Sequence, residues 1–426
     1  MCYSRSTEVV PAKWRWPDEG RSLLGGEAMS RTVALRSLVE DARSRIVGFA
    51  ELLLRTPSLS GHEEQVAQLV QSEMRALGYT WTRVDEAGNV IGRLAGGDGR
   101  TTLLHSHMDV VDPGEASRWR YGPFSGQMAE EYLWGRGSSD AKGALVAQVY
   151  AVGLLREAGL RPAGDVYVSA VVMEETAGLG TRHLLRWLRP DLAVIGEPSG
   201  NTLRRGHRGR LELVVTVRGR SAHASAPDQG LNPHFPMARF LLELLQMPMA
   251  PDPVFGSSSV TPTLAYVDQT SSNVIPAEVT VHLDWRAVPG ETANDARGRL
   301  LEVLDRTIEP GIQVAVSIRE RSLRTYTGLE EILDLNMPGF CLEADDARLL
   351  SAQAILEHAL GRPVAVDVWT FSTDGGSLSA AGIPCIGFGP GEEEMAHVID
   401  ERIEIDQLLE ATVGYMALAL EMGRQN

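Results

Sequence analysis

Acidic and histidine side chains stand at five points of the chain where an apolar run ends. The five segments are LLHSHMD (103–109), GRGSSD (135–140), VVMEE (171–175), VIGE (194–197) and AH (396–397). Because functional groups gather at the carboxyl ends of strands in a parallel α/β sheet, we expect these points to converge on one crevice. Two histidines and three carboxylates suit two divalent metal ions. The pattern therefore predicts a two-metal hydrolase.

The charges of these residues are consistent with such a centre. Two divalent ions would bring four positive charges, against three negative charges from Asp140, Glu175 and Glu197 and one from a bridging hydroxide. A carboxylate such as Asp140 can bridge metals about 3.5–4 Å apart. Adjacent acids on an extended segment point to different sides, so Glu174 is free to act as a general base while Glu175 binds metal.

Length and composition indicate an ordinary globular protein. The 426 residues predict two domains, or one large domain with an insertion. The net charge of -16 argues against nucleic acid as a partner, because no excess of Lys and Arg is available to neutralise phosphates. Three scattered cysteines make no disulfide framework, and no apolar run approaches the roughly 18 residues that a membrane span needs. We expect a cytoplasmic protein with no membrane partner.

The first 28 residues lack the pattern of a folded segment. They carry no apolar signal-peptide region, and helical periodicity starts only near Val33. We expect residues 1–28 to be a non-native or disordered extension. Either Met29 is the true start of the protein, or the segment is a disordered tail.

Strands and helices alternate in the first half of the chain. Helical spacing covers residues 35–54, 61–77 and 143–159, and strand patterns cover 90–94, 101–105 and 165–173. This alternation predicts an α/β fold with a layered, mostly parallel sheet. We assign residues 29–206 to the first part of a catalytic domain.

The pattern changes after Gly206. Strands at 210–218, 260–267, 279–285 and 312–318, with helices at 236–245 and 294–308, follow the order βαββαβ of a ferredoxin-like unit. Residues 207–321 are therefore predicted to be an inserted dimerisation or lid domain. Residues 322–343 read as irregular. The second part of the catalytic domain, 322–426, resumes with a helix at 344–360, a strand at 383–388 and a helix at 405–422.

Ordered motifs along the chain resemble a known enzyme family. They are HMDVV (107–111), Trp119 with PF (123–124), GRG (135–137), DAKG (140–143), EE (174–175), GEPS (196–199) and GPG (389–391) followed by His397. The chain resembles, over roughly residues 45 to 420, the dinuclear zinc peptidases and deacylases that include carboxypeptidase G, acetylornithine deacetylase and succinyl-diaminopimelate desuccinylase. The segments GHRGR (206–210) and GFGPG (387–391) are most similar to its selenium metabolism-linked hydrolases.

The resemblance implies two Zn²⁺ per subunit, with Co²⁺ or Mn²⁺ as open alternatives. It places His107, Asp140 and Glu197 on one ion, and Asp140, Glu175 and His397 on the other. Asp109 would orient His107 from behind, Glu174 would be the general base, and a non-proline cis peptide would follow Asp140. His105 would not be a ligand.

The resemblance also implies residues that hold the substrate. His223 of the inserted domain would reach the partner's active site in a homodimer and stabilise the oxyanion, although the sequence leaves a monomer open. Asn273 and Arg286, with Gly375 and Gly376, would bind a small substrate through its free carboxylate. For Arg286, a surface ion pair is an alternative interpretation.

These observations together predict a hydrolase that cleaves N-acyl amino acids or small peptides through a metal-bridging hydroxide. The segment LSAA (378–381) lacks the acidic and basic residues that desuccinylases keep there, which argues against that activity. A non-catalytic dimeric binding or regulatory protein is the alternative, although all five ligands and Glu174 are present. An amidohydrolase barrel, suggested by His105-Ser106-His107, lacks its eightfold strand-helix repeat.

Overall fold

The computed structural model describes residues 26–424. Most of the predicted extension, residues 1–28, lies outside the described residues, and its last three residues belong to helix α1 (Gly26–Asp41). Whether Met29 is the start of the protein therefore stays a prediction. No helix within the described range combines the length and the apolar character needed to cross a membrane.

A nine-stranded sheet forms the larger part of the molecule. Its centre, β6-β3-β7-β22, is parallel, and antiparallel strands flank it on both sides. In sheet order the strands are β1 (Trp81–Val84), β2 (Val90–Leu94), β6 (Val166–Val171), β3 (Thr102–His107), β7 (Leu192–Ile195), β22 (Cys385–Gly387), β8 (Leu203–His207) and β20 (Phe340–Cys341), with β21 (Val366–Trp369) paired to β8. The predicted α/β class with a mostly parallel sheet is confirmed.

Helices cover this sheet and bury its apolar strands. The long ones are α2 (Arg43–Arg55), α3 (Glu64–Ala76), α4 (Gly143–Glu157), α8 (Ala347–Leu360) and α10 (Ile405–Glu421). Helix α4 is buried along almost its whole length and packs against α10. The single helix predicted at residues 35–54 is wrong, since the chain bends at Ala42 between α1 and α2. Apolar spacing continues through the bend, so periodicity does not reveal it.

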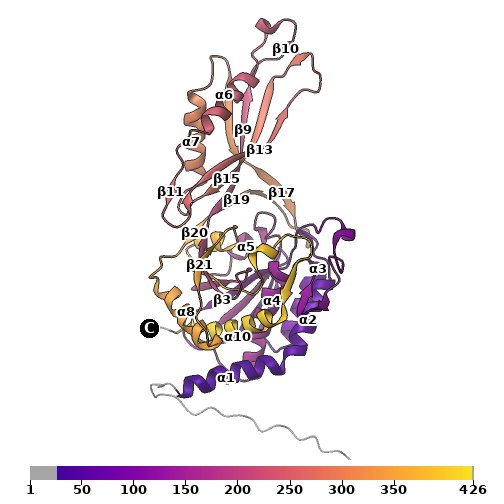
Figure 1. The fold of residues 1–426 in the computed structure, drawn as a ribbon, viewed down its shortest axis with the longest axis vertical. Coiled ribbons are helices and arrows are strands. Elements are labelled where there is room, and N and C mark those ends of the chain that lie inside the picture. The colour runs from indigo at the N-terminus through magenta and orange to yellow at the C-terminus, as the bar shows by residue number, and fades with distance from the viewer. Residues whose placement is uncertain (1–25, 425–426) are drawn as a thin grey trace, which may run out of the picture.

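The inserted unit has its own sheet and its own core. Its elements are β9 (Gly209–Arg218), α6 (His234–Leu244), β13 (Ser259–Val267), β15 (Glu278–Ala287), α7 (Ala293–Asp305) and β16 (Gln313–Ile318). The antiparallel order β13-β15-β9-β16 confirms the predicted ferredoxin-like unit. Figure 1 shows α6 and α7 on one side of this sheet, which stands away from the larger one. Trp285 and Phe240 lie in a cluster separate from the core of the larger sheet.

The stretch predicted to be irregular, residues 322–343, contains short strands. A hairpin is formed by β17 (Glu320–Arg324) and β18 (Glu330–Asp334), and β19 (Asn336–Met337) and β20 follow. The hairpin joins the inserted unit to the larger sheet, because Tyr326 Oη donates to Gly88 O at 2.9 Å and Arg182 bonds to Asp334 at 2.6 Å. Its charged, mostly exposed strands lack the apolar alternation that marks a buried strand.

Candidate metal centre

The predicted ligand positions meet at the carboxyl ends of the central strands. His107 is the last residue of β3, Glu175 lies in the turn after β6, and Glu197 follows β7. Asp140 lies just before α4, and His397 is in the loop after β22. Two groups of three have all their ligand atoms within 4.8 Å of one another: His107, Asp140 and Glu197, and Asp140, Glu175 and His397.

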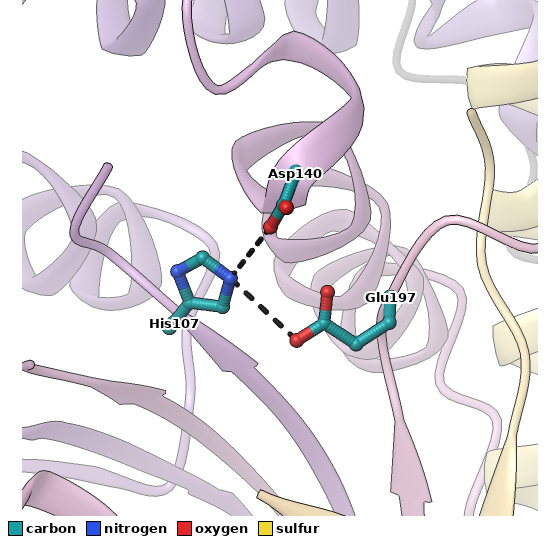
Figure 2. A group of neighbouring side chains, drawn as sticks. All are labelled: His107, Asp140 and Glu197. Carbon is teal, nitrogen blue, oxygen red and sulfur yellow. Dashed lines mark hydrogen bonds and ion pairs between the residues drawn. The ribbon is translucent and has the colours of Figure 1, made fainter. Parts of the chain in front are cut away.

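The first group is built around the ring of His107. Its Nε2 lies 2.9 Å from Asp140 Oδ1 and 3.5 Å from Glu197 Oε1 (Figure 2). All three side chains are buried. The two carboxylates converge on one nitrogen, so three donor atoms lie within 4.8 Å of one another.

The second group shares Asp140 with the first. His397 Nε2 lies 3.2 Å from Asp140 Oδ2 and 2.9 Å from Glu175 Oε1. The two oxygens of Asp140 therefore face different histidines. Although burial opposes ionisation, hydrogen bonds from both histidines hold the pKa of Asp140 below its usual range. A carboxylate placed in this way can bridge two cations.

The donor set fits two divalent cations. Asp140, Glu174 and Glu197 are buried together, and burying several carboxylates without a compensating cation is costly. Within the described residues, Glu197 Oε2 is buried without a hydrogen-bond partner, and burial raises the pKa of Glu197 to about 7. A cation at this position would replace the proton and use the free oxygen.

The turn after β6, which carries Glu174 and Glu175, is held by side chains from other segments. Four successive amides are bound: Val172 N to Asn89 Oδ1 at 3.0 Å, Met173 N to Glu63 Oε1 at 3.1 Å, Glu174 N to Asp109 Oδ1 at 3.0 Å and Glu175 N to Asp109 Oδ2 at 3.2 Å. The position of the proposed base and its neighbouring ligand therefore depends on three side chains distant in the sequence.

Asp109 lies between His107 and the turn after β6. Its carboxylate accepts the amides of Glu174 and Glu175 and the hydroxyl of Ser60, the last at 2.7 Å. His107 Nδ1 lies 2.9 Å from the backbone oxygen of Asp109 but 3.6 Å from its carboxylate. The backbone carbonyl thus orients the imidazole, and the carboxylate mainly fixes the neighbouring turn.

Glu401 holds the loop that carries Asp140. This buried carboxylate accepts the amides of Ser139 at 2.9 Å and Asp140 at 3.1 Å, and it pairs with Arg136 at 2.6 Å. The peptide bond from Asp140 to Ala141 is cis, as the resemblance implies. The sequence pattern does not predict these contacts, because Glu401 is more than 260 residues away from the amides that it binds.

Glu174 lies beside a buried polar network. Burial, followed by the charge of Asp374, raises the pKa of Glu174 well above its ordinary value. Asp374 Oδ2 accepts from Thr181 Oγ1 at 2.5 Å and lies 3.3 Å from His105 Nε2. The other nitrogen of His105 lies 2.7 Å from Ser169 Oγ. His105 is thus engaged in this network and belongs to neither group of metal-facing side chains.

His223 and Asn273 lie far from this centre within one chain. His223 is exposed in β10 (Ala222–His223), which Figure 1 places at the end of the inserted unit away from the larger sheet. Its Nδ1 lies 2.7 Å from Ser225 Oγ, and Asn273 Oδ1 accepts from Ser271 Oγ at 2.5 Å. Their side-chain contacts are local, and their roles stay predictions.

The other predicted substrate-binding residues have structural partners. Arg286, on β15, donates through Nε to Asp284 Oδ1 at 2.7 Å, so the ion pair weighed from sequence is present. Gly375 and Gly376 begin α9 (Gly375–Ala380) and are buried. A Cβ atom on Gly376 would lie 1.8 Å from Pro338 O, and one on Gly375 would lie 2.7 Å from Phe340 Cε1. Close packing therefore accounts for both glycines, whatever they contribute to binding.

Comparisons with known proteins agree with this geometry. The family described as Peptidase family M20/M25/M40 matches residues 103–421. The uncharacterised protein YgeY of Escherichia coli K12 is 30% identical over 92% of this chain and 98% of its own. Succinyl-diaminopimelate desuccinylase of Paracoccus denitrificans is 30% identical over 84% of this chain and 92% of its own. The Bacillus subtilis YXEP protein, a dinuclear metal-binding peptidase, shares the fold with a TM-score of 0.67 at 14% identity, over 89% of this chain and 98% of its own.

Proposed function

The chain belongs to the M20/M25/M40 peptidase family, a family of metal-dependent hydrolases. We propose that it cleaves the amide bond of an N-acyl amino acid or of a small peptide with a free carboxylate. The observation that carries the proposal is the split environment of Asp140, whose two oxygens face His107 and His397. One carboxylate shared by two ligand groups is the arrangement expected of a two-metal hydrolase.

We assign His107, Asp140 and Glu197 to one Zn²⁺, and Asp140, Glu175 and His397 to the other. Two such ions would polarise the amide carbonyl and lower the pKa of a water molecule between them. Histidine nitrogens and carboxylate oxygens suit zinc, and the same donors also accept Co²⁺ or Mn²⁺.

Glu174 acts as the general base in this proposal. Its side chain is buried beside the ligands, and burial and Asp374 raise its pKa. A base whose pKa is raised toward neutrality can take a proton from the attacking water and return it to the leaving nitrogen. Asp109 keeps this side chain in place through the amide of Glu174.

The inserted unit contributes the remaining substrate contacts. We assign oxyanion stabilisation to His223 of the partner subunit and binding of the substrate carboxylate to Asn273 and Arg286. These assignments require a homodimer through the inserted unit, in which β13 is a largely exposed edge strand. We expect the enzyme to work in the cytoplasm.

The range of substrates is narrowed by the first residues of α9, which follow Asp374. In this chain the small residues Gly375 and Gly376 are followed by LSAA (378–381), which offers no charged group to a succinyl chain. Several relatives are desuccinylases, but in this chain the residues of α9 favour a smaller or uncharged acyl group, or an amino-terminal residue of a dipeptide.

The test is amide hydrolysis by the zinc-reconstituted protein across N-acyl amino acids and dipeptides. Glu174→Gln should lower kcat by about 10²–10⁴ and still bind two zinc ions per chain. Glu302→Gln, an exposed glutamate of α7, is the matched control and should retain full activity. Two bound metals without turnover on any member of the panel would contradict the proposal and favour a binding or regulatory protein.

A further inference from the structure

A buried glutamate that the sequence analysis did not single out contacts the back of the metal centre. Glu63 immediately precedes α3 and is fully buried. Its Oε1 accepts the amide of Met173 at 3.1 Å and that of Gly61 at 2.9 Å. Met173 is the residue before Glu174, so Glu63 contacts the backbone that carries the proposed base.

The turn after β6 depends on contacts of this kind. Met173 has a φ of 55° and Ala177 one of 66°, both in the left-handed region that non-glycine residues rarely adopt. Such conformations persist only where the surroundings enforce them. The amides of residues 172–175 are all bound by side chains of other segments, and Glu63 binds the one at Met173.

The segment before Glu63 is tied to the same site from a second side. Ser58 Oγ donates to Met108 O at 2.7 Å, and Val110 N donates to Ser58 O at 2.9 Å. Ser60 Oγ donates to Asp109 Oδ2 at 2.7 Å. Residues 58–63 therefore contact both the segment after β3 and the turn after β6, and they fix the distance between the two.

We propose that Glu63 is a positioning residue: by accepting the amide of Met173, it holds the turn that places Glu174 and Glu175. The kinetic consequence rests on the proposed function, whereas the effect on metal binding does not require that a substrate be known. Since Glu175 belongs to the group with Asp140 and His397, loss of Glu63 should disturb that group more than the one around Glu197.

Glutamine is a close replacement for Glu63. Burial and the charge of Asp109 raise the pKa of Glu63 to about 8, so an uncharged side chain of the same shape suits this site. Within the described residues, its Oε2 is buried without a hydrogen-bond partner. A glutamine keeps the accepting oxygen at the position of Oε1, whereas an alanine removes it.

The experiment compares Glu63→Ala, Glu63→Gln and the control Glu64→Ala, which replaces the exposed neighbouring acid. Zinc titration of the apo proteins by calorimetry separates two binding events, assigned with Glu175→Gln and Glu197→Gln as references. One of the two binding events should be weakened by Glu175→Gln. We expect Glu63→Ala to lower the zinc affinity of that same event by about 10–100-fold. The Glu197 event should change little, and Glu63→Gln and Glu64→Ala should resemble the wild type.

Hydrogen exchange and kinetics provide independent readouts. In Glu63→Ala, amides of residues 172–175 should exchange faster, while those of β6 stay protected. With an active substrate, kcat should fall about 10–100-fold with little change in KM, and Glu63→Gln should restore it. Equal weakening of both zinc events, unchanged exchange in the turn, or equal damage from alanine and glutamine would each overturn the proposal. If the wild type hydrolyses nothing, zinc titration and exchange still decide it.

Discussion

The two regions that carry predicted functional residues are built in contrasting ways. At the carboxyl ends of β3, β6 and β7, the metal-facing side chains are mostly buried, and other segments hold the backbone that carries Asp140, Glu174 and Glu175. At the end of the inserted unit, His223 and Asn273 are exposed and contact neighbours two residues away. One chain thus brings the predicted metal-binding side chains together. The substrate contacts proposed for His223 and Asn273 require that the inserted unit of a second chain reach this centre.

Ion pairs also differ in burial between the two regions, with a buried pair near the metal centre and an exposed pair on the inserted sheet. Arg136 and Glu401, behind Asp140, have side chains that are 3% and 0% exposed. Arg218 and Glu278, a cross-strand pair on the inserted sheet, are 52% and 35% exposed. Burial makes the first pair sensitive to loss of one partner, because the remaining charge would be left without solvent. An exposed charge is solvated with or without its partner.

The largest expected effect is on the buried pair. Glu401→Ala should lower the free energy of unfolding by about 3–5 kcal/mol, since Arg136 would be left buried and unpaired. The measurement is urea unfolding of the metal-free protein at pH 8, because burial and Asp140 raise the pKa of Glu401 to about 7 and the carboxylate is ionised above it.

The matched change on the inserted sheet is Glu278→Ala. Its effect on the free energy of unfolding should stay below about 1 kcal/mol, as for other exposed pairs. Similar losses from both variants would show that the two regions do not differ in the way the burial of their ion pairs indicates.

His223→Ala tests whether a second chain completes the site. We expect kcat to fall by about 10²–10³, the usual cost of losing one oxyanion donor, with zinc content and stability unchanged because His223 is exposed. Exchanged mixtures of His223→Ala and Glu174→Gln should regain part of the activity, since one site per mixed dimer would have both residues intact. Full activity of His223→Ala, or no recovery in verified mixed dimers, would contradict the arrangement.

The same contrast explains what could be predicted from the sequence. The residues predicted to bind metal, such as His107 and Glu197, lie at the ends of apolar strands, where local pattern and motif point to them. The predicted βαββαβ order is confirmed in the inserted sheet. Glu63 and Glu401 could not be predicted in this way. Each stands beside a second acid, Glu64 or Asp400, and no local pattern marks it. Each binds backbone far away in the sequence, 110 residues away for Glu63 and Met173.

The bend between α1 and α2 and the hairpin of β17 and β18 could not be predicted from the sequence for a related reason. The bend at Ala42 leaves the apolar spacing intact, and the hairpin of β17 and β18 has charged, exposed strands. Hydrophobic periodicity reports which face is buried, not where a helix bends or which strand lies at a surface. Asp109 gives a further case. The resemblance implies that it orients His107, and its carboxylate lies closer to the amides of Glu174 and Glu175 than to the ring of His107.

A pH-dependent effect is expected at the boundary between the regions, where β8 passes into β9. His207 ends β8 and is fully buried. Its Nε2 accepts the amide of Thr373 at 3.1 Å, and burial lowers the pKa of the ring to about 4. The unfolded chain therefore takes up a proton first, and stability falls as the pH drops from about 6.5 towards 4.

Between pH 8 and pH 5, the free energy of unfolding should fall by about 2 kcal/mol more in the wild type than in His207→Gln. His234→Gln, at an exposed histidine of α6, should show no such difference from the wild type. Parallel pH dependence of unfolding in the wild type and His207→Gln would show that the boundary is open to solvent, as the end of the inserted unit is.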